Sequence, residues 1–221
     1  MGMGIDERNQ MAKRAAEEIT EGMAVNLGIG IPSLVPNHLP SELLVMFHAE
    51  NGILGIGGTP LKGSEDENLC NAGGLPVSVV PGASYCDSAT AFGMIRSGKI
   101  DMTILGSLQV SQTGDLANWI VPGKKVPGMG GAMELSQKAK KVIVLMKHTD
   151  KHGQSKLLEK CTLPLTSGAC VDMVITNMAV FEIKDRSLVL TELFSPYSIE
   201  EVTEKTDCGF LSASKIRKIE Y

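Results

Sequence analysis

Short apolar runs alternate with segments of helical periodicity through the first two-thirds of this chain. The apolar runs have the length of strands and lie at residues 23–27, 43–47, 77–80, 102–105 and 142–146. The segments between or before them are typical of amphipathic helices and lie at residues 6–21, 84–97 and 130–140. Strands that alternate with helices pair in parallel, and the crossover helices cover the faces of the sheet. The pattern therefore predicts an α/β fold with a mostly parallel sheet and helices on both faces.

The last third of the chain has a different spacing. Apolar runs at residues 171–176, 178–183 and 188–190 follow one another too closely for crossover helices, which predicts antiparallel pairing at one edge of the sheet. Ser198 and Glu201 have the spacing of a capping box and predict a late helix. Because no internal repeat, low-complexity tract or linker interrupts the 221 residues, we expect one domain over residues 1–221.

Composition excludes several classes of protein. The net charge of −4 provides no overall attraction to nucleic acid. No apolar run approaches the ~18 residues that span a membrane, and the N-terminal segment lacks the pattern of a secretory signal. The five cysteines form no C-x-x-C pair, and the pair His148 and His152 has no third ligand nearby. We therefore expect a cytoplasmic protein with reduced thiols, no metal site and no nucleic-acid or membrane partner.

Three glycine-rich segments have the character of turns at the ends of strands, where open α/β sheets bind their ligands. They cover residues 26–32, 50–58 and 123–134. None matches a nucleotide-binding fingerprint, since Pro32 and Ser33 interrupt the first and no Walker motif is present. The third segment would place free backbone N–H groups at the start of a helix, which suits an anion or an oxyanion. A tight turn that needs positive φ angles explains the same glycines.

Glu50 is the acidic residue whose setting most favours chemistry. It follows a strand that contains Leu44, Val45 and Phe47 and precedes an apolar, glycine-rich stretch. Such neighbours remove water from a carboxylate, which suits a catalytic group. A helix cap or a turn hydrogen bond made by Glu50 and Asn51 is an equally simple explanation.

Positive charge is concentrated between Lys124 and Lys160, where nine lysines face three acidic residues. A solvated surface explains this excess. A face that binds an anionic ligand, such as a nucleotide phosphate, is the alternative.

Four motifs taken together are those of a known family. The segments AVNLGIGIP, HAENGILGIG, GDLANWIVPGKKVPGMGGAMEL and KHTDKHGQSKLLEKCTLPLT resemble the B (β) subunits of family I 3-oxoacid CoA-transferases. The likeness is greatest to the succinyl-CoA:3-oxoacid and acetate/butyrate–acetoacetate types, and it covers about residues 5–215. It implies the fold that these enzymes share with certain sugar-phosphate isomerases.

The resemblance also implies which residues act. Glu50 matches the glutamate nucleophile of the family, and Asn26 matches an asparagine that holds the reacting carbonyl or the glutamate. Gly131 matches a glycine whose N–H belongs to the oxyanion hole. Further substrate-binding positions implied by the same motifs are Gly28, Gly30, Asn51 and Gly130. Two residues depart from the common pattern: Ala49 stands in place of Ser, and Glu134 in place of Asp.

The implied reaction is CoA transfer between an acyl-CoA and a 3-oxoacid or short-chain carboxylic acid, as in ketone body metabolism. It proceeds through a glutamyl-CoA thioester with ping-pong kinetics, with CoA as a substrate and without a permanently bound cofactor. The family's active site lies between this type of chain and an A (α) subunit, so we expect an α2β2 heterotetramer. Two alternatives stay open: a non-catalytic effector-binding or scaffold subunit, and a sugar-phosphate isomerase-like enzyme that uses Glu50 as a base.

Overall fold

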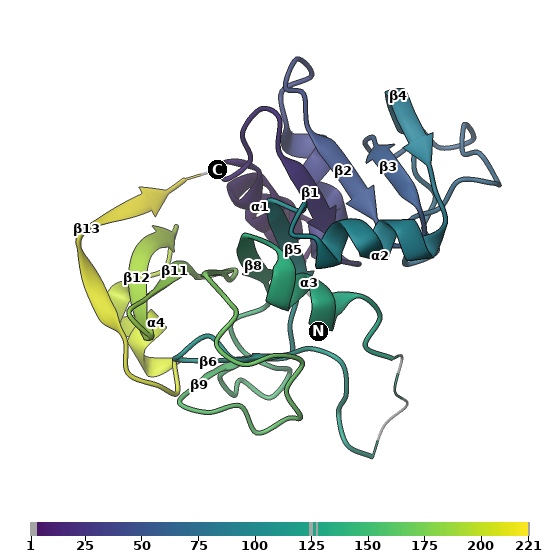
Figure 1. Cartoon of the computed structure of the whole chain (residues 1–221). Helices are drawn as coiled ribbons and strands as arrows, with labels where there is room; N and C mark the ends of the chain where they lie inside the picture. Colours follow the sequence, from purple (N-terminus) through teal and green to yellow (C-terminus); the bar gives the residue numbers. More distant parts are fainter. Residues whose placement is uncertain (1–3, 124–125, 127, 221) are drawn as a thin grey trace.

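The computed structural model describes residues 4–123, 126 and 128–220. Its main feature is a ten-stranded mixed sheet (Figure 1). In sheet order the strands are β13 (Leu211–Ile219), β12 (Ser187–Phe194), β11 (Ala179–Lys184), β10 (Met173–Ile175), β8 (Lys141–Leu145), β5 (Met102–Gly106), β1 (Ala24–Leu27), β2 (Met46–Ala49), β3 (Ile53–Ile56) and β4 (Val79–Tyr85). A small second sheet contains β7 (Leu116–Ala117), β6 (Gln109–Ser111) and β9 (Leu157–Leu158).

The centre of the main sheet is parallel, as the alternating pattern predicts. Strands β10, β8, β5, β1 and β2 pair in parallel, and their side chains are mostly buried. The expected antiparallel pairing near one edge is also confirmed, because β10, β11 and β12 pair antiparallel, while the outermost strand β13 pairs with β12 in parallel. A second antiparallel edge, formed by β2, β3 and β4, lies at the opposite end of the sheet.

Helices cover both faces of this sheet. Helix α1 (Ile5–Ala16) and the 3-10 helix η1 (Ile31–His38) pack on one face through an apolar cluster that includes Met11 and Val35. Helices α2 (Ser88–Arg96) and α3 (Ala132–Lys138) lie in front of the sheet in Figure 1 and bury Ile95 and Leu135 on the other face. The late helix α4 (Ile199–Glu204) carries the predicted Ser198 capping box. The α/β prediction is thus confirmed.

The predicted helix at residues 6–21 was too long. Helix α1 ends at Ala16, and Gly22 belongs to a separate turn with a φ of +80°. Glu18 is held just past the helix by ion pairs with Arg14 and Lys141. The chain leaves the helix there, so that Ile19 reaches the core. The predicted helix at 84–97 likewise begins later, at Ser88, with the Asp87 carboxylate accepting the Thr90 N–H as its cap.

The strand predicted at 43–47 is shifted toward the carboxyl end, since β2 covers Met46–Ala49 and leaves Leu44 exposed. Pairing with β1 explains the shift, because it places Phe47 and Ala49 in the core. The segment predicted as a turn after Glu50 contains strand β3 instead. A bulge at Gly55, where φ is +96°, accounts for the glycine that suggested a turn.

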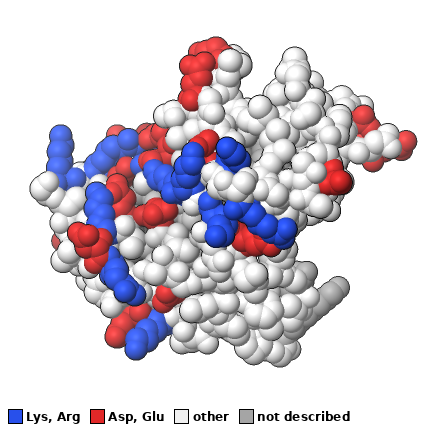
Figure 2. All heavy atoms as spheres, in the orientation of Figure 1, with Lys and Arg blue, Asp and Glu red and all other residues white. Residues whose placement is uncertain are grey.

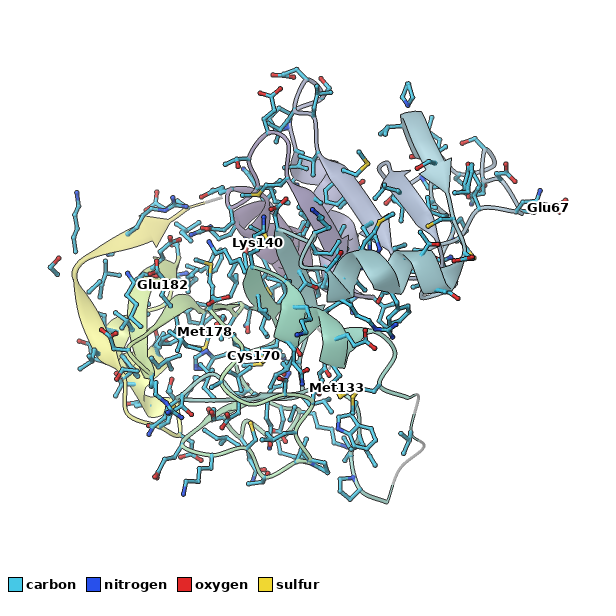
Figure 3. The ribbon with its side chains drawn as sticks, viewed as in Figure 1. Glu67, Met133, Lys140, Cys170, Met178 and Glu182 are labelled. Atoms are coloured by element: carbon cyan, nitrogen blue, oxygen red, sulfur yellow. The ribbon has the colours of Figure 1, made fainter. Side chains whose placement is uncertain are left out.

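A long loop joins β3 to β4 and projects from the body of the molecule. Glu67 lies at its far end (Figure 3). The loop and the edge strand leave large apolar side chains exposed, among them Leu61, Leu75 and Tyr85. The edge of the sheet beside Glu50 is therefore much less covered than its centre.

Two lysines of the segment 124–160 form ion pairs with acidic residues. Lys140 pairs with Asp101, and Lys141 pairs with Glu18. The cationic side chains in Figure 2 lie among acidic ones on the face that is shown. Lys124 and Lys125 lie outside the described residues. In the described part of the chain, no helix combines the length and apolarity needed to cross a bilayer.

Candidate active site

Three polar residues form a buried row across the centre of the sheet. Asn26 on β1 is the register partner of Thr103 on β5 and of His48 on β2. All three are almost completely buried, with at most 2% of each residue exposed. Buried polar side chains need hydrogen-bond partners, and these three bond to one another. His48 lies on β2, and Glu50 and Asn51 follow directly after the last residue of that strand.

Glu50 lies in the turn directly after β2 and is half-buried. The Asn26 side-chain amide donates to its Oε2 over 3.2 Å. The turn requires glycine at position 52, where φ is +108° and an added Cβ would collide with the backbone oxygen of Cys86. The Glu-Asn-Gly motif therefore directs the carboxylate toward Asn26 while the chain reverses into β3.

Gly131 lies against the same carboxylate, although 81 positions separate it from Glu50 in the sequence. A Cβ at Gly131 would lie 2.8 Å from Glu50 Oε1 and 2.9 Å from its Cγ. Gly131 is the N-cap of α3 and is buried, and its N–H has no acceptor among the described residues. The structure thus brings together the predicted residues Glu50, Asn26 and Gly131, as a carboxylate between one side-chain donor and one glycine backbone.

The other predicted site residues shape the surrounding turns. Gly28 packs on β5, where its N–H donates to the Ile104 carbonyl over 2.8 Å. Gly30 is the exposed N-cap of η1 with a φ of +86°, and Gly130 has a φ of +54° before α3. The Asn51 amide donates to the Cys70 carbonyl over 2.7 Å and so ties the β3–β4 loop to the site. For none of these four does the described structure give a hydrogen bond to Glu50.

His48 is a residue in contact with this site that reasoning from the sequence missed. Its Nε2 lies 3.1 Å from the Ala91 carbonyl of α2, which can only accept, so Nε2 carries the proton. Its Nδ1 then accepts from Asn26 Nδ2 over 3.1 Å. Burial lowers the pKa of His48, which keeps the ring neutral at neutral pH. A sequence signal existed: His48 stands two positions before Glu50, on the same side of an otherwise apolar strand.

The pair His148 and His152 does not form a metal site. The buried His148 ring has hydroxyl partners on both nitrogens, Thr176 and Thr206, at 3.0 Å each. Its burial lowers its pKa to about 4. His152 is exposed in a turn. Within residues 4–123, 126 and 128–220, no group of three or more His, Cys, Asp or Glu side chains is placed to hold a metal ion.

An apolar cavity of about 300 Å³ lies beside β2. Phe47 and Ala49 contribute to its wall, together with Leu27 and Val77. Ala49 directly precedes Glu50 in the sequence, while Glu50 itself does not line the cavity. Such a cavity can accommodate an apolar part of a substrate.

Comparisons with known sequences place the chain beside a described family. The model of the family described as "Coenzyme A transferase" matches residues 8–205. The chain is 64% identical over 207 residues to the probable coenzyme A transferase beta subunit of Bacillus subtilis (strain 168), covering 94% of this chain and 95% of the relative. It is 52% identical over 203 residues to the B subunit of the succinyl-CoA:3-ketoacid coenzyme A transferase of Helicobacter pylori (strain ATCC 700392 / 26695), covering 92% and 98%.

The fold also has solved counterparts. The apoenzyme of the acyl-CoA transferase YdiF from Escherichia coli O157:H7 superposes with a TM-score of 0.79 at 20% sequence identity. The match covers 100% of this chain but 44% of that chain. At this identity the likeness supports the fold alone, and it shows that the fold can form part of a longer polypeptide.

Proposed function

The chain belongs to the coenzyme A transferase family, as a B-type subunit, and we propose that it transfers CoA between an acyl-CoA and a 3-oxoacid or short-chain carboxylic acid through a thioester on Glu50. The observation that carries the proposal is the half-buried Glu50 carboxylate, held between the Asn26 amide and the backbone of Gly131. A carboxylate that is fixed and partly shielded from water is suited to act as a nucleophile.

The proposed reaction begins when a Glu50 oxygen attacks the thioester carbonyl of the acyl-CoA. The C–S bond breaks, CoA leaves as a thiolate, and a mixed anhydride remains on Glu50. The thiolate then attacks the Glu50 carbonyl and expels the first carboxylate, which leaves glutamyl-CoA. A second carboxylate repeats the two steps in reverse order and departs as the new acyl-CoA, so Glu50 is regenerated.

Each attack creates an oxyanion that needs a donor. The Asn26 Nδ2–H already points at Glu50 Oε2, the atom that becomes an oxyanion when the thiolate attacks Glu50. The Gly131 N–H, which has no acceptor among the described residues, is the second candidate donor. One such donor contributes about 2.7–4 kcal/mol to transition-state stabilisation. The chain has groups for nucleophilic attack and charge stabilisation, which is what acyl transfer requires.

The active enzyme also contains an A subunit, and the assembly is an α2β2 heterotetramer. The names of the relatives support a partner, since they denote a B or beta subunit. The thinly covered sheet edge beside Glu50 supports it as well. The isolated chain is expected to show negligible transferase activity, and full turnover without a partner would contradict this arrangement.

The test of the proposed function is a covalent adduct. The complex of this chain with its A subunit is incubated with succinyl-CoA or acetoacetyl-CoA, and peptide masses are measured. We expect CoA on the peptide that contains Glu50, and no adduct in Glu50→Gln. Glu67→Gln is the matched control, because Glu67 is an exposed acid at the end of the β3–β4 loop.

The alternatives give a different result in the same experiment. An isomerase that uses Glu50 as a base, or a non-catalytic scaffold, would give no adduct in any variant. Absence of the adduct from the unmodified complex would therefore overturn the proposed function.

A further inference from the structure

Asn26 can assist the transfer only if its side-chain amide presents N–H groups, and not its oxygen, to Glu50. The two halves of an amide have nearly the same shape, so sterics alone do not select the orientation. Three acceptors surround Nδ2: His48 Nδ1 at 3.1 Å, the His48 carbonyl at 3.1 Å and Glu50 Oε2 at 3.2 Å. On the other side, the Thr103 hydroxyl lies 3.5 Å from Oδ1 and donates to it.

The contribution of His48 follows from its other contact. The His48 Nε2–H donates a hydrogen bond to the Ala91 carbonyl, so the neutral ring has a lone pair at Nδ1. That lone pair faces Asn26 Nδ2, in a region from which water is excluded. If the amide were reversed, Oδ1 would face the Nδ1 lone pair, a carbonyl oxygen and a carboxylate. Such a contact in a buried site is strongly unfavourable.

We propose that His48 is a positioning residue for the transfer, whose Nδ1 lone pair holds the Asn26 amide with its N–H toward Glu50. The inference rests on the proposed function, because it assigns His48 a part in stabilising the oxyanion on Glu50. His48 does not touch the reacting atoms and acts through Asn26. Of the acceptors around Asn26 Nδ2, the His48 carbonyl belongs to the backbone and Glu50 is the nucleophile itself, so the ring nitrogen is the acceptor that a side-chain substitution can remove without changing the nucleophile.

Two substitutions separate positioning from packing. His48→Leu fills much of the buried space but offers no acceptor to Asn26. His48→Gln keeps one acceptor and one donor on a side chain that is long enough to reach both Asn26 and Ala91. Each variant is prepared as the complex with its A subunit, and its thermal unfolding is measured beside that of the unmodified complex.

The readouts are the rate and the amplitude of CoA-adduct formation on Glu50 from succinyl-CoA, together with kcat and KM. We expect His48→Leu to reach the full adduct amplitude at a rate lowered about tenfold or more, with kcat lowered in parallel and KM changed by less than about twofold. His48→Gln should recover the rate to within about threefold of the unmodified complex.

Other results would overturn the proposal. His48 serves folding alone if the His48→Leu complex forms the adduct at the rate of the unmodified complex. The same conclusion holds if the rate is unchanged and only the amount of adduct is lower. If His48→Gln is as slow as His48→Leu while both complexes unfold at the same temperature, the acceptor is not the feature that matters. Failure of the proposed function gives a different result from failure of this inference: the unmodified complex itself then forms no adduct.

Discussion

Gly131→Ala tests whether the contact between α3 and Glu50 sets the position of the nucleophile. The backbone at Gly131 has φ −79° and ψ −4°, which alanine adopts without strain. The new methyl carbon would lie 2.8 Å from Glu50 Oε1, whereas ordinary contacts begin at 3.4 Å. The carboxylate must therefore move by about 0.6 Å, and displacements approaching 1 Å can cost about a hundredfold in rate. We expect kcat to fall by about ten- to a hundredfold.

The assay is steady-state transfer by the complex with its A subunit, together with the rate of CoA-adduct formation on Glu50. Thermal unfolding should change little, since the perturbation acts on one half-buried side chain. Gly93→Ala is the matched control, because its added Cβ inside α2 meets nothing within 4 Å. A Gly131→Ala complex that forms the adduct at the unmodified rate would refute the argument that this glycine makes room for the carboxylate.

Three further predictions concern stability. Arg14→Met leaves the buried Glu192 carboxylate without its two-bond partner at 2.6 Å and should lower the free energy of unfolding by about 3 kcal/mol in urea titrations; an unchanged value would contradict this. Unfolded His148 binds a proton below its ordinary pKa of 6.5, and the folded ring does so only near 4, so stability should fall by up to about 3 kcal/mol as pH drops from 6.5 to 4. His148→Gln should reduce that pH dependence, and an identical dependence would exclude this origin. Gly52→Ala combines a φ of +108° with a collision on the Cys86 carbonyl, so it should lower the free energy of unfolding by at least about 2 kcal/mol and lower the melting temperature with it. A variant as stable as the parent would show that the turn adapts.

Local patterns in the sequence were sufficient for the elements whose ends are set by their own residues. The Ser198 side chain accepts the backbone N–H of Glu201, three positions later, so the signal for the start of α4 lies within one turn of the chain. Boundaries set by distant contacts were placed wrongly. The end of α1 depends on an ion pair between Glu18 and Lys141, and the start of β2 depends on pairing with β1. Lys141 is far from Glu18 in the sequence, and β1 is far from β2, so no local pattern predicts these two boundaries.

That a carboxylate follows an apolar strand and enters a glycine turn can be read from the residue order alone, because strand, acid and glycine are consecutive at residues 44–58. The surroundings of the carboxylate come from contacts between residues far apart in the chain. The partners of Asn26 lie 22 and 77 positions away, at His48 and Thr103, and they meet because backbone hydrogen bonds align β2, β1 and β5 in one register. Gly131, at the start of α3, lies against the other carboxylate oxygen of Glu50. Residue types are local, but the orientation of a buried amide depends on all the donors and acceptors around it, and the folded chain alone brings these together.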